Sequence, residues 1–212
     1  MRAKLSRCKW AESHPLLSDY HDAEWGTPRH DDRTHFEFLI LEAAQAGLSW
    51  LTVLKKREGY RKHFAGFDFN KVAKFGEADV RRMMKDAGII RNELKIRSAI
   101  SNARPFIQVR KEFGTFDRYL WNFVDGKQVK SRIRTSKDLV PFTPLSDAVS
   151  KDLKKRGFRF VGSTVIYSHL QAVGIVNDHE ETCFRKNATA SPPSREAALS
   201  EEIRDLLKSK NQ

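Results

Sequence analysis

The longest apolar stretch of the chain, residues 35–57, reads HFEFLILEAAQAGLSWLTVLKKR. Gly47 interrupts it, so the pattern predicts two helices joined by a short turn. One charged side chain, Glu42, lies within the apolar part, one helical turn from Phe38 and Leu39. An unpaired buried carboxylate is costly, so two interpretations stay open: Glu42 lies at the polar edge of an amphipathic helix, or it is a functional acid in a pocket.

Composition limits the classes of protein that the chain can belong to. Its 212 residues are enough for one large domain or two packed helical lobes, and the net charge of +12 favours a polyanionic partner, either nucleic acid or an anionic membrane surface. No apolar run approaches the roughly 18–20 residues of a membrane span. The first residues lack the apolar core of a secretory signal, and two cysteines do not make a disulfide framework, so a reducing cytosol is expected.

A second informative stretch is DAGIIRNELKIRSAISNA, residues 86–103. Gly88 is predicted to end one helix as a left-handed C-cap, and Asn92 or its neighbour to begin the next. Backbone N–H groups at that second helix start can hold a phosphate oxygen, and Arg91 and Lys95 add positive charge. An ordinary connection between two helices of a bundle would look almost the same, so DNA contact is one of two interpretations.

Both cysteines belong to a set of potential metal ligands. Cys8 and His21 lie near the start, whereas His179 and Cys183 are spaced so that both share one helix face. Two thiolates and two imidazoles make a closed tetrahedral site of the structural kind. The alternative is two inert thiols and two surface histidines.

The remaining segments are assigned from periodicity and turn residues. Residues 104–125 are predicted to be helical, and residues 126–145 to form a basic, proline-punctuated loop. Residues 158–176 have a strand-like composition, but we interpret them as a buried helix because no nearby segment offers a partner strand. A linker is expected at 187–194 and an amphipathic tail helix at 195–209.

Five motifs together carry a resemblance to a known family: RCKW at 7–10, YHDAEWG at 20–26, LEAAQAGLSWLTVLKKR at 41–57, DAGIIRNELKI at 86–96 and KKRGFRFVGSTVIYSHLQAVGIVNDH at 154–179. The chain resembles the 3-methyladenine DNA glycosylase I family over residues 7–184. The resemblance implies an all-α fold of the helix-hairpin-helix DNA glycosylase superfamily, with a structural zinc site joining the N- and C-terminal segments. It also implies a glycosylase domain at 1–186, followed by a linker and tail at 187–212.

The resemblance also implies roles for individual residues. It places a structural Zn²⁺ on Cys8, His21, His179 and Cys183. It places the base pocket on Glu42, Tyr20 and Trp50, with Trp10 and Trp25 as an aromatic wall. It places the DNA contacts on Gly47 and Leu48, which fill the gap in the duplex, and on the hairpin residues Gly88, Ile90, Arg91 and Lys95. In one departure, Leu17 stands where other members can carry a tyrosine.

The implied chemistry agrees with these residue types. The target base has to leave the helical stack before it can be cut out. 3-Methyladenine in DNA is cationic, so the face of Trp50 and an ionised Glu42 would both favour it over neutral adenine. The methylated base is already a good leaving group, and no lysine stands out as a Schiff-base nucleophile. We therefore expect a monofunctional hydrolase that releases the base and leaves an abasic site.

The expected partner is double-stranded alkylated DNA, with no membrane association. The protein is expected to be monomeric and cytoplasmic, acting at the nucleoid. Alternatives are a non-catalytic DNA-binding protein, a glycosylase for a different alkylated base, and a zinc-stapled interaction protein that uses its tail helix.

Overall fold

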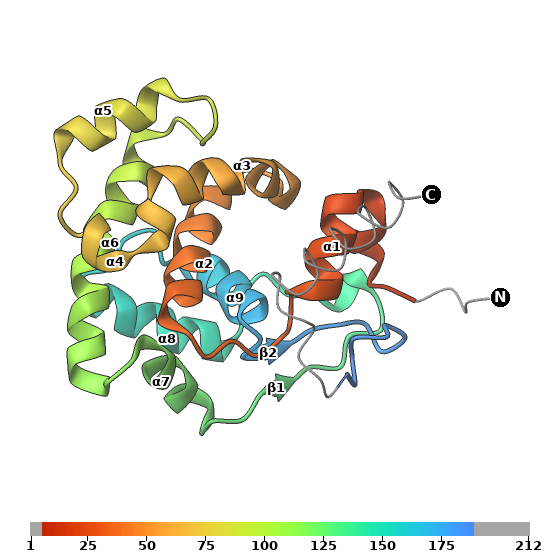
Figure 1. Cartoon of the computed structure of the whole chain (residues 1–212). Helices are drawn as coiled ribbons and strands as arrows, with labels where there is room; N and C mark the ends of the chain where they lie inside the picture. Colours follow the sequence, from red (N-terminus) through yellow and green to blue (C-terminus); the bar gives the residue numbers. More distant parts are fainter. Residues whose placement is uncertain (1–5, 189–212) are drawn as a thin grey trace, which may run out of the picture.

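The computed structural model describes residues 6–188, which form a mostly helical fold. Figure 1 shows the arrangement. The α-helices are α1 (Pro15–Ala23), α2 (Asp32–Gln45), α3 (Trp50–His63), α4 (Phe69–Val72), α5 (Glu77–Lys85), α6 (Glu93–Phe113), α7 (Phe116–Trp121), α8 (Pro144–Lys155) and α9 (Ser163–Ala172). Short 3-10 turns are η1 (Lys9–Ser13), η2 (Ala65–Phe67), η3 (Asn122–Val124) and η4 (Ser136–Asp138), and the strands are β1 (Val129–Lys130) and β2 (Val176–Asn177).

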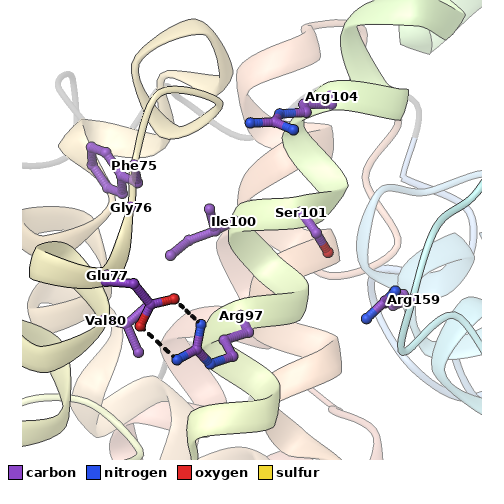
Figure 2. A pocket seen from close by; sticks show the side chains of 9 residues that line it. All are labelled: Phe75, Gly76, Glu77, Val80, Arg97, Ile100, Ser101, Arg104 and Arg159. Carbon is purple, nitrogen blue, oxygen red and sulfur yellow. Dashed lines mark hydrogen bonds and ion pairs between the residues drawn. The ribbon is translucent and has the colours of Figure 1, made fainter.

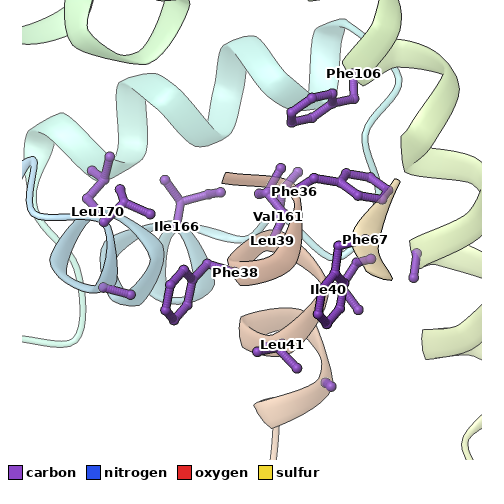
Figure 3. Close-up of a cluster of buried hydrophobic side chains, with 14 of the residues drawn as sticks. Phe36, Phe38, Leu39, Ile40, Leu41, Phe67, Phe106, Val161, Ile166 and Leu170 are labelled. Atoms are coloured by element: carbon purple, nitrogen blue, oxygen red, sulfur yellow. The ribbon is translucent and has the colours of Figure 1, made fainter. Parts of the chain in front are cut away.

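Helix α2 is the centre of the molecule. Every residue from His35 to Ala44 is buried, because α3, α6, α7 and α9 all pack against this helix. Figure 3 shows Phe36 of α2 close to Phe106 of α6, with Ile166 of α9 beside the same helix. Residues 35–44 therefore have no solvent-exposed face, which agrees with the apolar side chains on every face of this part of α2.

The predicted break between two helices is confirmed. Gly47 has a φ of +78°, which a residue with a Cβ rarely adopts. The Ser49 hydroxyl then accepts a hydrogen bond from the Thr52 backbone N–H, which begins α3. The turn leaves Leu48 exposed between the two helices.

The hairpin between α5 and α6 differs from the prediction in one respect. Gly88 does not have a left-handed conformation, and α5 ends at Lys85 with Asp86 as its C-cap. The close approach of α3 to the hairpin requires glycine at position 59 instead, because a Cβ on Gly59 would lie 2.1 Å from the carbonyl oxygen of Gly88. Asn92 begins α6 as predicted, and its side chain accepts a hydrogen bond from the Lys95 N–H.

The prediction of a buried helix over 158–176 was only partly right. The helix covers Ser163–Ala172, and β2 follows it and pairs in parallel with β1, Val129 opposite Val176. The partner strand, β1, lies in the segment predicted to be a loop. The sequence around either strand gives no sign that the two would pair. The fold is therefore mostly helical rather than strictly all-α.

Two further predictions concern the helix over 104–125 and the C-terminal segment. The helix predicted over 104–125 is interrupted, because α6 ends at Phe113 and Gly114 adopts a φ of +87° before α7 begins. The linker at 187–194 and the tail helix at 195–209 lie almost entirely outside the described residues. Within those residues, no helix combines the length and apolarity needed to cross a bilayer.

Candidate functional site

A cavity of about 190 Å³ lies where α1, α2, α3 and α9 meet. The structure brings together there all five residues of the predicted base pocket: Trp10, Tyr20, Trp25, Glu42 and Trp50. Four further residues, which sequence reasoning missed, complete the lining: Gln45, Leu139, Ser168 and Gln171. Ser168 and Gln171 are three residues apart on α9, so their shared helix face was an available signal. Leu139 lies in a loop and gave none.

Glu42 is a buried acid without a partner. Its side chain is 4% exposed, and its Oε2 atom has no hydrogen-bond partner among residues 6–188. Burial raises the pKa of the Glu42 carboxyl to about 8, because a low-dielectric surrounding disfavours the charged form. The first of the two interpretations, a polar helix edge, is therefore wrong. A cation that enters the cavity would favour the ionised form.

Aromatic rings form the walls of the cavity. The ring centroids of Trp50 and Tyr20 lie 5.2 Å apart, and those of Trp10 and Trp25 lie 5.1 Å apart. Trp50 is the first residue of α3, so the Ser49 cap fixes its backbone at the cavity edge. Burial raises the pKa of the Tyr20 phenol well above its usual value, which keeps it a neutral hydrogen-bonding group. Leu17, the departure from the resembled pattern, is buried on the same helix as Tyr20.

A buried ion network connects the helices that line the cavity. The guanidinium of Arg57 on α3 donates two hydrogen bonds to Glu24, of 2.7 and 2.8 Å, and one to Glu37 on α2, of 2.7 Å. It also lies 5.4 Å from the ring centroid of Phe38. Because Glu24 caps α1, the network ties together the three helices that carry Tyr20, Glu42 and Trp50.

The predicted DNA contacts lie on two neighbouring segments. Leu48 is 41% exposed at the α2–α3 turn, and Arg91 is exposed on the hairpin, whereas Ile90 is half-buried. The ammonium group of Lys95 is turned inward: it donates hydrogen bonds of 2.9 and 2.5 Å to the carbonyl oxygens of Ala44 and Ala46. Lys95 thus caps the end of α2 and links the hairpin helix to the turn that carries Leu48.

Cys8, His21, His179 and Cys183 converge as predicted. All four are buried, and their potential ligand atoms lie within 4.8 Å of one another. The Sγ of Cys8 lies 3.5 Å from Nδ1 of His179, and the Sγ of Cys183 lies 3.3 Å from Nε2 of His21. A tetrahedral zinc site with ordinary bond lengths would separate its ligands by about 3.3–3.8 Å. The spacing therefore fits such an ion.

The groups around the cluster fix which ring nitrogen of each histidine faces inward. Nδ1 of His21 lies 2.8 Å from a carboxylate oxygen of Asp22, and Nε2 of His179 lies 3.1 Å from the carbonyl oxygen of Trp25. Both acceptors require N–H donors, so the lone pairs of the other ring nitrogens are left facing the centre. Backbone N–H groups donate to both sulfurs, from Glu180 to Cys8 and from Arg185 to Cys183.

A larger cavity of about 350 Å³ lies elsewhere, between α5 and α6 (Figure 2). Its one acidic lining residue, Glu77, is held in an ion pair by Arg97, with Nη2 and Oε2 2.7 Å apart. Among the residues that line it, no acid or nucleophile is left unpaired, so the smaller cavity is the better candidate for chemistry.

Comparisons with known proteins agree with this choice. Residues 10–186 match the methyladenine glycosylase family. The chain is 48% identical to DNA-3-methyladenine glycosylase 1 of Escherichia coli over 84% of its length and 96% of that protein. It is 40% identical to the DNA-3-methyladenine glycosylase of Haemophilus influenzae, over 84% and 96%.

Solved structures give the same result. A crystal structure of a 3-methyladenine DNA glycosylase I superposes with a TM-score of 0.82 at 47% identity, covering 85% of this chain and 99% of that one. A variant of such an enzyme in complex with 3-methyladenine superposes with a TM-score of 0.83 at 32% identity, covering 86% and 98%.

Proposed function

The chain belongs to the methyladenine glycosylase family, and from this we infer that it acts in base excision repair as a DNA-3-methyladenine glycosylase. It hydrolyses the N-glycosidic bond of 3-methyladenine in alkylated DNA, releases the free base and leaves an abasic site. The observation that carries this function is a buried, unpartnered Glu42 in a cavity walled by aromatic rings.

The residues of the cavity favour a cationic base over a neutral one. The extruded base stacks on Trp50, whose ring face attracts positive charge. The empty cavity holds Glu42 mostly as the neutral acid near neutral pH, since the pKa of its carboxyl is about 8. The arrival of a cation lowers that pKa, so Glu42 releases its proton to solvent and becomes the counter-ion. Neutral adenine gives no such gain and stays weakly bound.

The bond then breaks without an acid catalyst. The leaving group is the cationic 3-methyladenine itself. It takes the electron pair of the broken N-glycosidic bond and departs as a neutral base. Water adds to the sugar carbon, and a proton is lost to solvent. Among the residues that line the cavity there is no lysine, which supports a monofunctional enzyme without a Schiff-base step.

For DNA binding, we propose that α5, the hairpin and α6 act as a helix-hairpin-helix unit. Gly88, Ile90 and Arg91 would contact the backbone of the duplex, while Gly47 and Leu48 enter the gap left by the extruded base. The exposed Leu48 and Arg91 support this assignment. The inward hydrogen bonds of Lys95 indicate that it positions the Leu48 turn instead of contacting phosphate.

We further propose that Cys8, His21, His179 and Cys183 hold a structural Zn²⁺. Four buried ligands leave no open position for a catalytic water, so the ion would supply stability alone. The orientation of both imidazoles supports the proposal. A monomeric state and a cytoplasmic location remain predictions.

Release of free bases from methylated duplex DNA tests the function directly. Glu42→Gln keeps the shape of the side chain but cannot become a counter-ion, so 3-methyladenine release should fall by about a hundredfold or more. Affinity for a duplex with an abasic site should change little, because Glu42 contacts the base and not the backbone.

Glu112→Gln, at an exposed position on α6, serves as the matched control and should leave release unchanged. Unchanged release by Glu42→Gln would refute its role. Tight binding of abasic duplex by the wild-type protein without any base release would favour the non-catalytic alternative.

A further inference from the structure

Gln171 lines the base cavity with an amide group whose orientation is fixed. Its Nε2 donates a 2.7 Å hydrogen bond to Oδ2 of Asp178, a buried carboxylate immediately after β2. The hydroxyl of Tyr167, one turn earlier on α9, donates to the same oxygen. Gln171 lies on α9, and its partner Asp178 is also held by Tyr167, so the amide of Gln171 has little freedom to rotate.

The partner determines which end of the amide faces the base. A carboxylate accepts hydrogen bonds and cannot donate them, so only the NH₂ of Gln171 can face Asp178. The carbonyl oxygen Oε1 therefore lies on the other side of the amide. Within the described part of the chain, no donor group contacts Oε1. The cavity thus contains an acceptor that is not used inside the protein.

This acceptor differs in kind from Glu42. The Glu42 carboxyl changes protonation state: in the empty cavity it is mostly neutral near neutral pH, since its pKa is about 8, and a bound cation favours its ionised form. The carboxyl accepts a hydrogen bond when it is ionised and can donate one when it is neutral. An amide does not change protonation state. Gln171 therefore presents a hydrogen-bond acceptor to the base whatever the protonation state of Glu42, so it favours a 6-amino group over a 6-carbonyl group.

We propose that Oε1 of Gln171 accepts a hydrogen bond from the 6-amino group of the extruded base and so selects 3-methyladenine over 3-methylguanine. The inference rests on the proposed function and adds a specificity-determining residue to it. Both lesions are cationic 3-methylpurines, so stacking on Trp50 and charge attraction do not separate them. An amino group has two N–H bonds, one for Glu42 and one for Gln171. A 6-carbonyl oxygen would instead place a second acceptor opposite Oε1, with no hydrogen atom between the two oxygens.

The test compares release of both bases from one sample of methylated duplex DNA. The wild-type protein should release 3-methyladenine faster than 3-methylguanine. Gln171→Met keeps the length of the side chain and removes the acceptor, so the ratio of the two rates should fall by about tenfold or more. Because both products come from one reaction, any inactive fraction of the variant cancels in the ratio.

Gln171→Leu is a second variant without the acceptor and should lower the ratio in the same way. The matched control is Gln108→Met, at an exposed position on α6, which should leave both rates and their ratio unchanged. A ratio that stays at the wild-type value in both Gln171 variants would overturn the proposal, as would a wild-type protein that releases both bases equally. A wild-type protein that releases neither would instead overturn the proposed function.

Discussion

At the scale of single residues, the carboxyl of Glu42 is costly to the folded protein. Folding transfers this group from water to an apolar site that offers Oε2 no hydrogen bond. Such costs are typical of groups that are kept for chemistry and not for stability. The cost has a definite pH dependence, because it applies only when the unfolded chain would carry the charge.

The pH dependence predicts a change in stability for Glu42→Gln. The pKa of the carboxyl is about 8 in the folded state against 4.5 for the free side chain, so wild-type stability falls as pH rises between these values. The variant lacks this loss. Its advantage in the free energy of unfolding should therefore grow by about 2–3 kcal/mol from about pH 6 to about pH 9. Urea unfolding of both proteins at the two pH values measures it; a constant difference would contradict the buried, neutral state of Glu42.

Residue by residue, the sequence reveals which side chains are unusual but not which ones meet. Glu42 was visible as a lone charge in an apolar run, and the two cysteines were visible by their rarity. Gln171 looked like an ordinary polar residue of a helix. Its role depends on Asp178, which lies in a different element, and on the cavity that four helices build together.

At the scale of elements, Lys95 joins two segments that are distant in sequence. Its position beside the hairpin suggested a phosphate contact, but its ammonium group caps the carbonyl end of α2. Partial burial also lowers the pKa of Lys95. Contacts between segments that are distant in sequence also explain why the partner strand of β2 could not be predicted from the residues around it. Helices with strong caps, such as α2 and α3, were predictable because their signals are local.

Two roles are possible for Lys95, a cap on α2 or a phosphate contact, and they predict different effects of Lys95→Met on DNA binding. Loss of a cap should loosen the Leu48 turn, which weakens binding to abasic duplex but leaves its salt dependence unchanged. Loss of a phosphate contact, expected for Arg91→Met, should lower the slope of log affinity against log salt by about one unit. Binding titrations over a series of salt concentrations distinguish the two. A reduced slope for Lys95→Met would show instead that Lys95 contacts a phosphate.

At the scale of the whole molecule, the cluster of Cys8, His21, His179 and Cys183 joins the two ends of the described chain. Cys8 and Cys183 lie near opposite ends of the described residues but meet at one point, and the Phe184 N–H donates to the Ser6 carbonyl oxygen beside them. The first and last described segments run together next to α1 (Figure 1). Closing so long a loop removes much of the conformational freedom of the unfolded chain.

Removal of the metal should therefore lower stability before it alters chemistry. The purified protein should contain about one zinc ion per chain, and a strong chelator should lower its melting temperature by about 10 °C or more. Loss of base release should follow loss of folded protein. Elemental analysis and thermal melting with and without chelator provide the measurements. Cys183→Ser should resemble the chelated protein, and a metal-free wild type with an unchanged melting temperature would refute the assignment.

The cluster also touches the wall of the base cavity. The rings of Trp10 and His21 lie 5.5 Å apart, and those of Trp25 and His179 lie 4.7 Å apart, centroid to centroid. The second contact places Trp25 against His179, which lies 154 residues later in the chain. A nascent chain that has not yet reached Gln171 and His179 lacks part of the cavity lining and the ring that packs against Trp25. Base release would therefore begin only after the segment that carries Gln171 and His179 has been synthesised and has packed against the N-terminal part of the fold.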